Sequence, residues 1–410
     1  MQNLQAKKKK YAELIIQFGL HLQQGQNLLI KAPIDAFDFV KLVVEEAYNA
    51  GVDQIFYQWR SDELDLLKYQ KASVASFGKP LQRLEDGYAT ELKKNCAVLT
   101  LFSEDPFLFS QVQPELLNKE LQARRAARKA QLELISSNAT NRLIAAVPNL
   151  WRAKSLYPDL SAEESIERLR SQIFALVRID HEDPIEARKH HLQTLQSHAQ
   201  KLNHYAFKRL HYHADKTELT VELPTGHLRL CAWEKTQSWI LFCPNMPTEE
   251  VFTAPHKYGV NGTLGATLPL YYNGKLIEDF GFTFKDGAVV DFYAKKGYET
   301  LKSLLETDPW ARRLWEVAIV PMSSPVCQSG LIFFNTLFDE NASCHFALGN
   351  SYPTTIKDGI TLDDAGKEKA GMNQSITHVD FMVGDKSLTI TGETTSWEEI
   401  AFFVDGERKI

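Results

Sequence analysis

The last third of the chain carries acidic and imidazole side chains whose types and spacing suit a metal centre. They are Glu249, Glu250, Glu316, Glu340, His345, His378 and Asp380. Only two of the twelve histidines, His345 and His378, lie in segments flanked by apolar residues, and each has carboxylates close by in sequence. Imidazole and carboxylate ligands suit divalent ions such as Zn²⁺, Co²⁺ or Mn²⁺, whereas a calcium site uses oxygen ligands. We therefore expect a carboxylate-rich centre for two metal ions.

His378 and Asp380 lie two residues apart in the strand-like segment SITHVDFMVG. Because side chains alternate across a strand, both point to one face and Val379 points to the other. A lone pair of this kind is more often a polar pair on an edge strand. Here the apolar run 381–383 predicts a buried strand, and buried polar groups need partners. A metal ion is a suitable partner, so one strand can supply two ligands.

Glu316 interrupts the apolar segment LWEVAIVP, which is predicted to begin an interior strand. A buried carboxylate without a partner is unfavourable, so Glu316 needs a cation. Arg312 or Arg313 offers an alternative to a metal ion, as an ion pair at a helix end. Glu249 and Glu250 likewise have an alternative, as charges at a helix terminus that follow a Pro-Thr pair.

His345 follows Cys344 directly and comes five residues after Glu340. Neighbouring residues on a strand point to opposite faces, so Cys344 and His345 are poorly placed to act as a nucleophile and its base. Taken singly, His345 is more often a core histidine and Glu340 a solvated acid. Together with the other acids they complete a set of metal ligands.

Composition limits the class of protein. The 410 residues are 44% hydrophobic and 24% charged, as in a globular chain of two or three domains. A net charge of -6 argues against a nucleic-acid partner. No segment reaches the roughly 18 apolar residues of a membrane span, and the lysine-rich start lacks the features of a signal peptide. The five scattered cysteines suit reduced thiols, so we expect a cytoplasmic protein without a membrane partner.

Residues 1–182 alternate short apolar runs with helical patterns, in the runs QNLLIKA, QIFYQW, CAVLTLF and RLIAAVP. This alternation predicts an α/β N-terminal domain with a mostly parallel sheet. Asp35 is predicted to cap the first helix of this pattern, and Gly51 to end it. The first predicted βα turn lacks the glycine-rich phosphate fingerprint, so the domain is not an obvious nucleotide binder.

Residues 183–410 are predicted to form a strand-rich α+β catalytic domain. It begins with an amphipathic helix over 183–203 and continues in short alternating strands. Asn273-Gly274 and Asp286-Gly287 are typical dipeptides of tight hairpin turns. One clear helix is expected in the segment TLKSLLETDPWARRLWE.

Several segments resemble the motifs of the M29 metallopeptidases, the family of aminopeptidase T and aminopeptidase S. They are TEEVFTAPH, LWEVAIVP, SGLIFFNTLFDENASCHFALG, SYP and NQSITHVDFMVG. The resemblance extends over essentially the whole chain, and NTLFDENASCH and HVDFM are its most specific parts. It implies a homodimeric aminopeptidase with an N-terminal α/β domain and a C-terminal domain that holds two divalent ions, from among Zn²⁺, Co²⁺, Mn²⁺ and Mg²⁺.

The resemblance also implies roles for individual residues. The implied metal ligands are Glu250, Glu316, His345, His378 and Asp380, with Glu316 between the ions and Glu340 in or against the ligand shell. Tyr352, in the SYP segment, is implied to be a catalytic residue that stabilises the transition state. Two positions depart from the family pattern. His256 stands where an acid is common, which bears on substrate recognition, and Trp315 stands where a glycine is usual, which narrows the pocket.

The predicted activity is removal of N-terminal residues from peptides with a free amino end. Two ions about 3.5–4 Å apart polarise the scissile carbonyl and acidify water in such centres. Glu249 or Glu340 would act as general base, and Tyr352 would donate a hydrogen bond to the oxyanion. One alternative is another dinuclear hydrolase such as a phosphoesterase, although few basic residues lie near the ligands in sequence. The other alternative is a binding protein whose acids and histidines only stabilise the fold.

Overall fold

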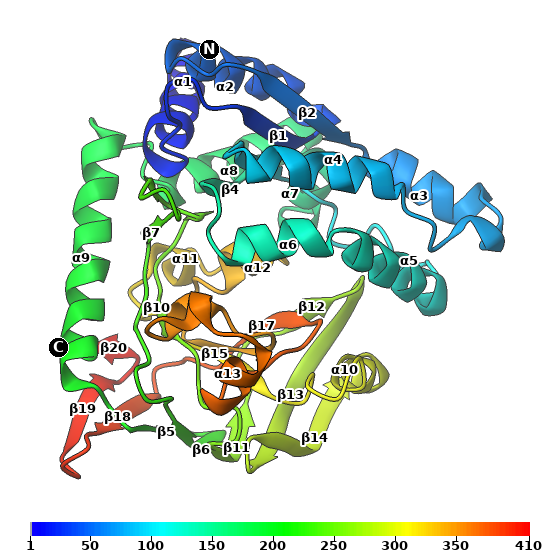
Figure 1. Ribbon diagram of the computed structural model, residues 1–410. Helices are drawn as coiled ribbons and strands as arrows, with labels where there is room; N and C mark the ends of the chain where they lie inside the picture. The colour runs from blue at the N-terminus through cyan, green and yellow to red at the C-terminus, as the bar shows by residue number, and fades with distance from the viewer. Residues whose placement is uncertain (1) are drawn as a thin grey trace. The chain divides into compact units, whose positions relative to one another are not determined.

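The computed structural model describes residues 2–410, which form two compact units (Figure 1). The first unit contains the chain up to His191 and the segment Trp233–Pro247. The second unit contains Leu192–Ala232 and Thr248–Ile410. The chain thus leaves the first unit inside helix α9 (Pro184–Tyr205) and returns to it once. The division into domains at residues 182 and 183 stays a prediction.

The first unit is built on a five-stranded sheet of order β2-β1-β3-β4-β9, in which every pairing is parallel. Its strands are β1 (Leu28–Pro33), β2 (Ile55–Arg60), β3 (Ala97–Phe102), β4 (Arg142–Ala146) and β9 (Asn245–Met246). All six residues of β1 are buried, as expected of a central strand in a parallel sheet. The predicted α/β fold is confirmed, but β9 comes from the returning segment and was not predicted.

Helices flank this sheet. They are α1 (Gln2–Glu13), the π-helix η1 (Leu14–Gly19), α2 (Phe37–Asn49), α3 (Asp62–Lys71), α4 (Gln82–Lys93), α5 (Pro114–Ala127), α6 (Lys129–Ser136), α7 (Leu150–Leu156) and α8 (Ala162–Leu176). Gly51 has a φ of 82° just after α2, which confirms its predicted role at a helix end. The prediction that Asp35 caps this helix is wrong. Residues 34–36 form a 3-10 turn, so α2 begins at Phe37.

The second unit is rich in antiparallel strands. A nine-stranded sheet contains β5 (Arg209–Ala214), β6 (Thr217–Glu222), β11 (Val260–Gly265), β12 (Leu270–Tyr272), β13 (Lys275–Lys285), β14 (Ala288–Lys296), β18 (Thr389–Glu393), β19 (Glu399–Val404) and β20 (Glu407–Arg408). Both predicted hairpin turns are confirmed, because Asn273, Gly274, Asp286 and Gly287 all have positive φ angles between their strands.

The helix expected in the segment 300–316 is present, but it covers only the first part of the segment. Helix α10 covers only Tyr298–Leu305, and β15 (Leu314–Ile319) occupies the end of the segment. Pro309 accounts for the difference, because a proline disfavours the helical conformation of the residue before it. Glu316 therefore lies on a strand and not at a helix end.

A four-stranded antiparallel sheet of order β10-β15-β16-β17 lies within the second unit. Its other strands are β10 (Val251–Thr253), β16 (His345–Gly349) and β17 (His378–Met382), and short helices α11 (Pro325–Gln328), α12 (Thr336–Asp339) and α13 (Asp364–Lys369) connect this region. Phe346 of β16 contacts Tyr212 of β5 at 5.0 Å between ring centres, so the two sheets pack together. The strands β15 and β16 are buried throughout.

None of the helices in residues 2–410 is both long enough and apolar enough to cross a bilayer.

Candidate metal centre

The register of the four-stranded sheet brings the predicted ligands to one face. Ala347 of β16 pairs with Glu316 of β15 on one side and with Asp380 of β17 on the other. His345 and His378 lie two residues before Ala347 and Asp380 on their own strands, so both share this face. Ala347 has a small side chain, which leaves room between the two carboxylates. Glu250 completes the set directly before β10, the strand that pairs with β15.

The ligand atoms form two groups of three that share Glu316. One group is Glu250, Glu316 and His345, and the other is Glu316, His378 and Asp380, with the ligand atoms of each group within 4.8 Å of one another. His345 Nε2 lies 3.2 Å from Glu250 Oε2 and 3.9 Å from Glu316 Oε1. His378 Nε2 lies 3.3 Å from Asp380 Oδ2. The arrangement suits two cations with one shared carboxylate.

The tautomer of His345 follows from its surroundings. Its Nδ1 lies 3.2 Å from the carbonyl oxygen of Ser343, which can only accept, so Nδ1 carries the hydrogen. When the ring is neutral, Nε2 then presents a lone pair toward Glu250 and Glu316, as in histidines that bind metals. Cys344 takes no part, because its thiol is directed at the carbonyl of Val320 at 3.4 Å. Imidazole nitrogens and carboxylate oxygens are ligands that fit a divalent transition metal.

Burial and mutual repulsion perturb the acids of this cluster. Burial, together with the negative charges of Glu250 and Asp380, raises the pKa of both Glu316 and Glu340 well above the usual value of 4.5. Burial lowers the pKa of His345, but its contact with Glu250 and the charges around it outweigh this and raise the pKa overall. Several buried acids that repel one another are stabilised by a bound cation.

Comparison with known proteins identifies the family. The sequence profile of the thermophilic metalloprotease family (M29) matches residues 4–407. The chain belongs to the M29 family. It is 41% identical over 401 residues to aminopeptidase 2 of Geobacillus stearothermophilus, with 97% of this chain and 96% of that protein covered. It is 36% identical over 406 residues to aminopeptidase AmpS of Bacillus subtilis (strain 168), with 99% of each covered.

A solved M29 structure has the same fold. Wild-type AmpT from Thermus thermophilus superposes with a TM-score of 0.93 at 35% identity, over 99% of this chain and 100% of that one. The expected family and the expected sequence of an α/β region followed by a strand-rich region are therefore confirmed. As a family of metalloproteases, M29 implies a divalent metal and peptide substrates.

Glu340, Glu249 and Tyr352 surround the M29 cluster without belonging to either group of three. Glu340 is buried at the end of α12 and lies within electrostatic reach of Glu250 and Asp380. Glu249 is also buried, and its backbone is held by Asn341 Oδ1 at 2.6 Å and by Arg408 Nη2 at 2.9 Å. The Tyr352 ring lies 5.7 Å from that of His378. His256 lies outside the cluster, and its nitrogen accepts a hydrogen bond from the backbone of Tyr258.

The predicted alternative, an ion pair of Glu316 with a preceding arginine, is excluded. Arg312 lies 3.8 Å from Glu306, and Arg313 donates to the carbonyl oxygens of Lys257 and Asp286. Both cations are thus engaged elsewhere. Among the described residues, His345 brings its Nε2 to 3.9 Å from Glu316 Oε1.

Asn341 and Asn373 hold backbone segments next to the candidate metal centre. The types of these two residues did not indicate this role in the sequence. Asn341 accepts a hydrogen bond from the backbone of Glu249, one residue before the candidate ligand Glu250. Asn373 donates to the carbonyl oxygens of Gly349 and Trp310, which ties the loop before β17 to the end of β16. Their proximity in sequence to candidate site residues could have indicated this role. Asn341 follows Glu340 directly, and Asn373 stands five residues before His378.

A β-bulge places an indole beside the cluster. The pairing of β15 with β16 shifts between Leu314 and Glu316, so Trp315 is an extra residue in the strand. Trp315 is fully buried, with its ring 4.5 Å from that of His378 and 4.7 Å from that of Tyr352. His378 is the most exposed of the five residues, with 37% of its side chain accessible. Trp315 therefore packs against this imidazole and limits where it can rest.

We expect Trp315→Ala to weaken metal binding at the His378 side of the centre about tenfold, the lower range for loss of a group that orients a ligand. We also expect a loss of about 3–5 kcal/mol of unfolding free energy from the cavity. Trp315→Phe should retain most of the metal affinity and most of the unfolding free energy. A titration with Co²⁺ followed by visible absorption measures the first effect, and Trp310→Ala in the same unit is the control. Unchanged affinity in Trp315→Ala would show that the indole only fills the core.

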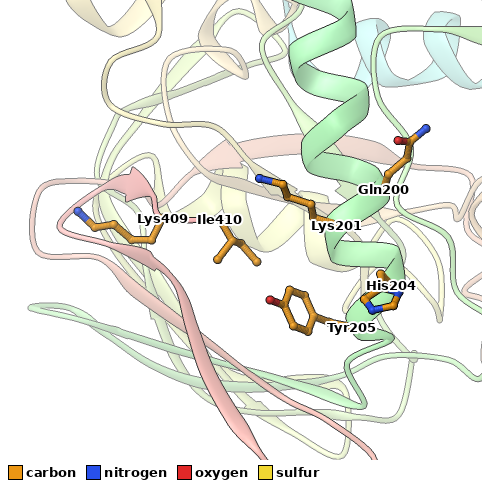
Figure 2. A pocket seen from close by; sticks show the side chains of 6 residues that line it. All are labelled: Gln200, Lys201, His204, Tyr205, Lys409 and Ile410. Atoms are coloured by element: carbon orange, nitrogen blue, oxygen red, sulfur yellow. The ribbon is translucent and has the colours of Figure 1, made fainter.

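A separate hollow lies at the end of the chain (Figure 2). Its volume is about 570 Å³, and it lies between the last turn of α9 and the two C-terminal residues, lined by Gln200, Lys201, His204, Tyr205, Lys409 and Ile410. It contains no carboxylate side chain and none of the cluster residues. We therefore do not assign the M29 chemistry to this hollow.

Proposed function

We propose that this chain is a metal-dependent aminopeptidase that hydrolyses N-terminal residues from peptides through a centre for two divalent ions. The observation that carries the proposal is the pair of three-residue groups joined by Glu316. Relatives named as aminopeptidases, covered over nearly their whole length, support peptides with a free N-terminus as the substrates.

The ligand roles follow the two groups. Glu250, Glu316 and His345 would hold one ion, and Glu316, His378 and Asp380 would hold the other. Bound divalent ions supply Lewis acidity, which polarises a peptide carbonyl and makes water more acidic. Glu316 positions both sites because it is the shared carboxylate. Zn²⁺, Co²⁺, Mn²⁺ and Mg²⁺ all accept carboxylate ligands, and the two imidazoles favour the first three.

Glu340 is the preferred general base, with Glu249 as the other candidate. Glu340 lies beside the cluster but outside both groups, so one of its oxygens can accept a proton from water and return it to the leaving amine. Tyr352 would donate its phenolic hydrogen to the oxyanion that develops at the scissile carbonyl.

We further propose a cytoplasmic homodimer, as the family resemblance implies. The five cysteines are free thiols, which suits a reducing compartment. Sedimentation of the purified chain would test the dimer, since a monomer at micromolar concentration would contradict it.

Chelation should abolish hydrolysis of aminoacyl chromogenic substrates, and Co²⁺ or Zn²⁺ should restore it, because the acids and imidazoles have no catalytic role without ions between them. N-acetylated versions of the same substrates should not be cleaved, since they lack the free amine. A phosphate ester serves as the control substrate for the phosphoesterase alternative. Equal cleavage of blocked and free substrates would refute an aminopeptidase, and full activity after chelation would refute a metal-dependent one.

A further inference from the structure

One face of the parallel sheet in the first unit changes from apolar to polar toward its carboxyl edge. The register places an apolar row of Leu29, Phe56 and Val98 across β1, β2 and β3. This row packs against α4 and α6 through Leu92, Tyr88, Leu134 and Ile135. Two residues further along, the row on the same face is Gln58, Lys31 and Thr100. A cationic residue thus stands in the middle of a covered sheet face.

The position of this polar row is one at which α/β proteins bind ligands. In the order β2-β1-β3-β4-β9, strand β1 lies between β2 and β3, so the direction of strand succession reverses at β1. Ligands of open α/β sheets bind at such a reversal, near the carboxyl ends of the strands. Lys31 is the fourth of the six residues of β1, in the half nearer that end.

Lys31 is buried but poorly satisfied. Only 8% of the residue is exposed, and within the described part of the chain Nζ has one hydrogen bond, to Gln131 Oε1 at 3.5 Å. The ammonium also lies 5.8 Å from the centre of the Tyr88 ring. Gln131 is held in place because its own amide donates to Glu85 Oε2 at 2.5 Å. An ammonium has three hydrogens to donate, so a buried one is expected to have closer acceptors.

Like charges gather around Lys31. Burial and the neighbouring charge of Arg128 lower the pKa of Lys31 to about 8, with Glu85 opposing and Arg60 adding to the effect. Arg60 is balanced by Glu104 at 2.6 Å, although its Nε is buried without an acceptor among the described residues. Lys31 and Arg128 therefore share one opposing carboxylate, Glu85. The two charges repel each other, and an anion bound beside Lys31 would offset this repulsion.

We infer that this row is a binding site for a small oxyanion, a phosphate or carboxylate group. Lys31 and Arg128 supply the charge, and Gln58 and Thr100 supply polar groups beside Lys31 on the same face. Lys31 and Arg128 carry two positive charges, and Glu85 supplies one negative charge against them. The remaining positive charge suits a single anionic group. This site is independent of the proposed peptidase activity.

Thermal unfolding of the full chain tests the site with inorganic phosphate and with acetate, each compared with chloride at equal ionic strength. Phosphate or acetate should raise the Tm by about 2–4 °C beyond chloride, because a ligand that binds only the folded state stabilises it. Lys31→Met should abolish this response. Without an added anion its Tm should equal or exceed that of the parent chain, because a repelled, poorly bonded charge is removed.

Lys129→Met is the matched control, since Lys129 is an exposed lysine of α6 that lies 3.9 Å from Glu133, and it should retain the response. Arg128→Gln gives a second variant in case Lys31→Met does not fold, and it should also lose the response. The series is repeated after chelation. A response confined to the metal-loaded chain, a response retained in both variants, or equal Tm values in all three salts would overturn the site.

Discussion

Glu316→Gln is expected to lower aminopeptidase turnover by about 10³-fold, the upper range for loss of one preorganised electrostatic group. The effect is large because Glu316 belongs to both groups of three, so a single substitution weakens the binding of both ions. Glutamine has nearly the same volume, and packing around β15 is therefore retained. Turnover of an aminoacyl substrate, with metal content measured on the same sample, checks the result.

The same substitution should stabilise the chelated protein. Glu316 is buried among Glu250, Asp380 and Glu340, and without metal its charge is repelled by theirs. A neutral amide removes that repulsion, so the Tm after chelation should rise while activity is lost. Glu393→Gln is the matched control, because Glu393 is a buried carboxylate of the same unit that pairs with Arg209 at 3.2 Å. It should retain both activity and metal. Full activity in Glu316→Gln would contradict the proposed role of Glu316 as a shared metal ligand.

The stability of the chelated chain should fall as the pH rises from about 5 to 8, and bound metal should reverse this trend. Glu316 and Glu340 have folded pKa values well above the unfolded value of 4.5. Groups with a raised pKa contribute stability that is complete below the unfolded pKa and is lost as the pH rises through the folded one. The raised pKa of His345 acts in the same direction above its unfolded value of 6.5.

Asp380 acts in the opposite direction at lower pH. Burial raises its pKa, but His378 and His345 outweigh this and hold the pKa below 3.8, so its contribution is lost only as the pH falls further. Metal ligands must be deprotonated, so metal binding releases protons and strengthens as the pH rises. The Tm measured by calorimetry with metal and the Tm measured with chelator should therefore move further apart as the pH rises. Parallel curves would mean that these acids do not bind the metal.

The side-chain pattern of β17 could be predicted from sequence because it depends only on local alternation. His378 and Asp380 share a face in any regular strand, and the apolar residues after them indicate burial. The hairpin turns at Asn273 and Asp286 are local in the same sense, since they depend on the backbone preferences of two residues.

Features that depend on distant partners could not be predicted. The bulge at Trp315 arises from pairing with β16, so nothing in the segment LWEVAIVP reveals it. Glu250, and not Glu249, lies in a group of three with Glu316 and His345, and only the family resemblance anticipated this difference. Asp35 was misassigned because a 3-10 turn and an N-cap favour the same residue types.

Strand β9 has a consequence for dividing the chain. It belongs to the segment Trp233–Pro247, yet it pairs with β4 in the sheet of the first unit. A fragment that stops at residue 182 would therefore leave the outer edge of β4 with unpaired backbone groups, next to the buried residues Leu143 and Ala145. An unpaired, flat and apolar strand edge promotes association between chains. We expect gene fragments designed from the linear order of the elements to associate through this edge, whereas a fragment that carries residues 233–247 on a short linker would keep Ile144 and Ala145 paired.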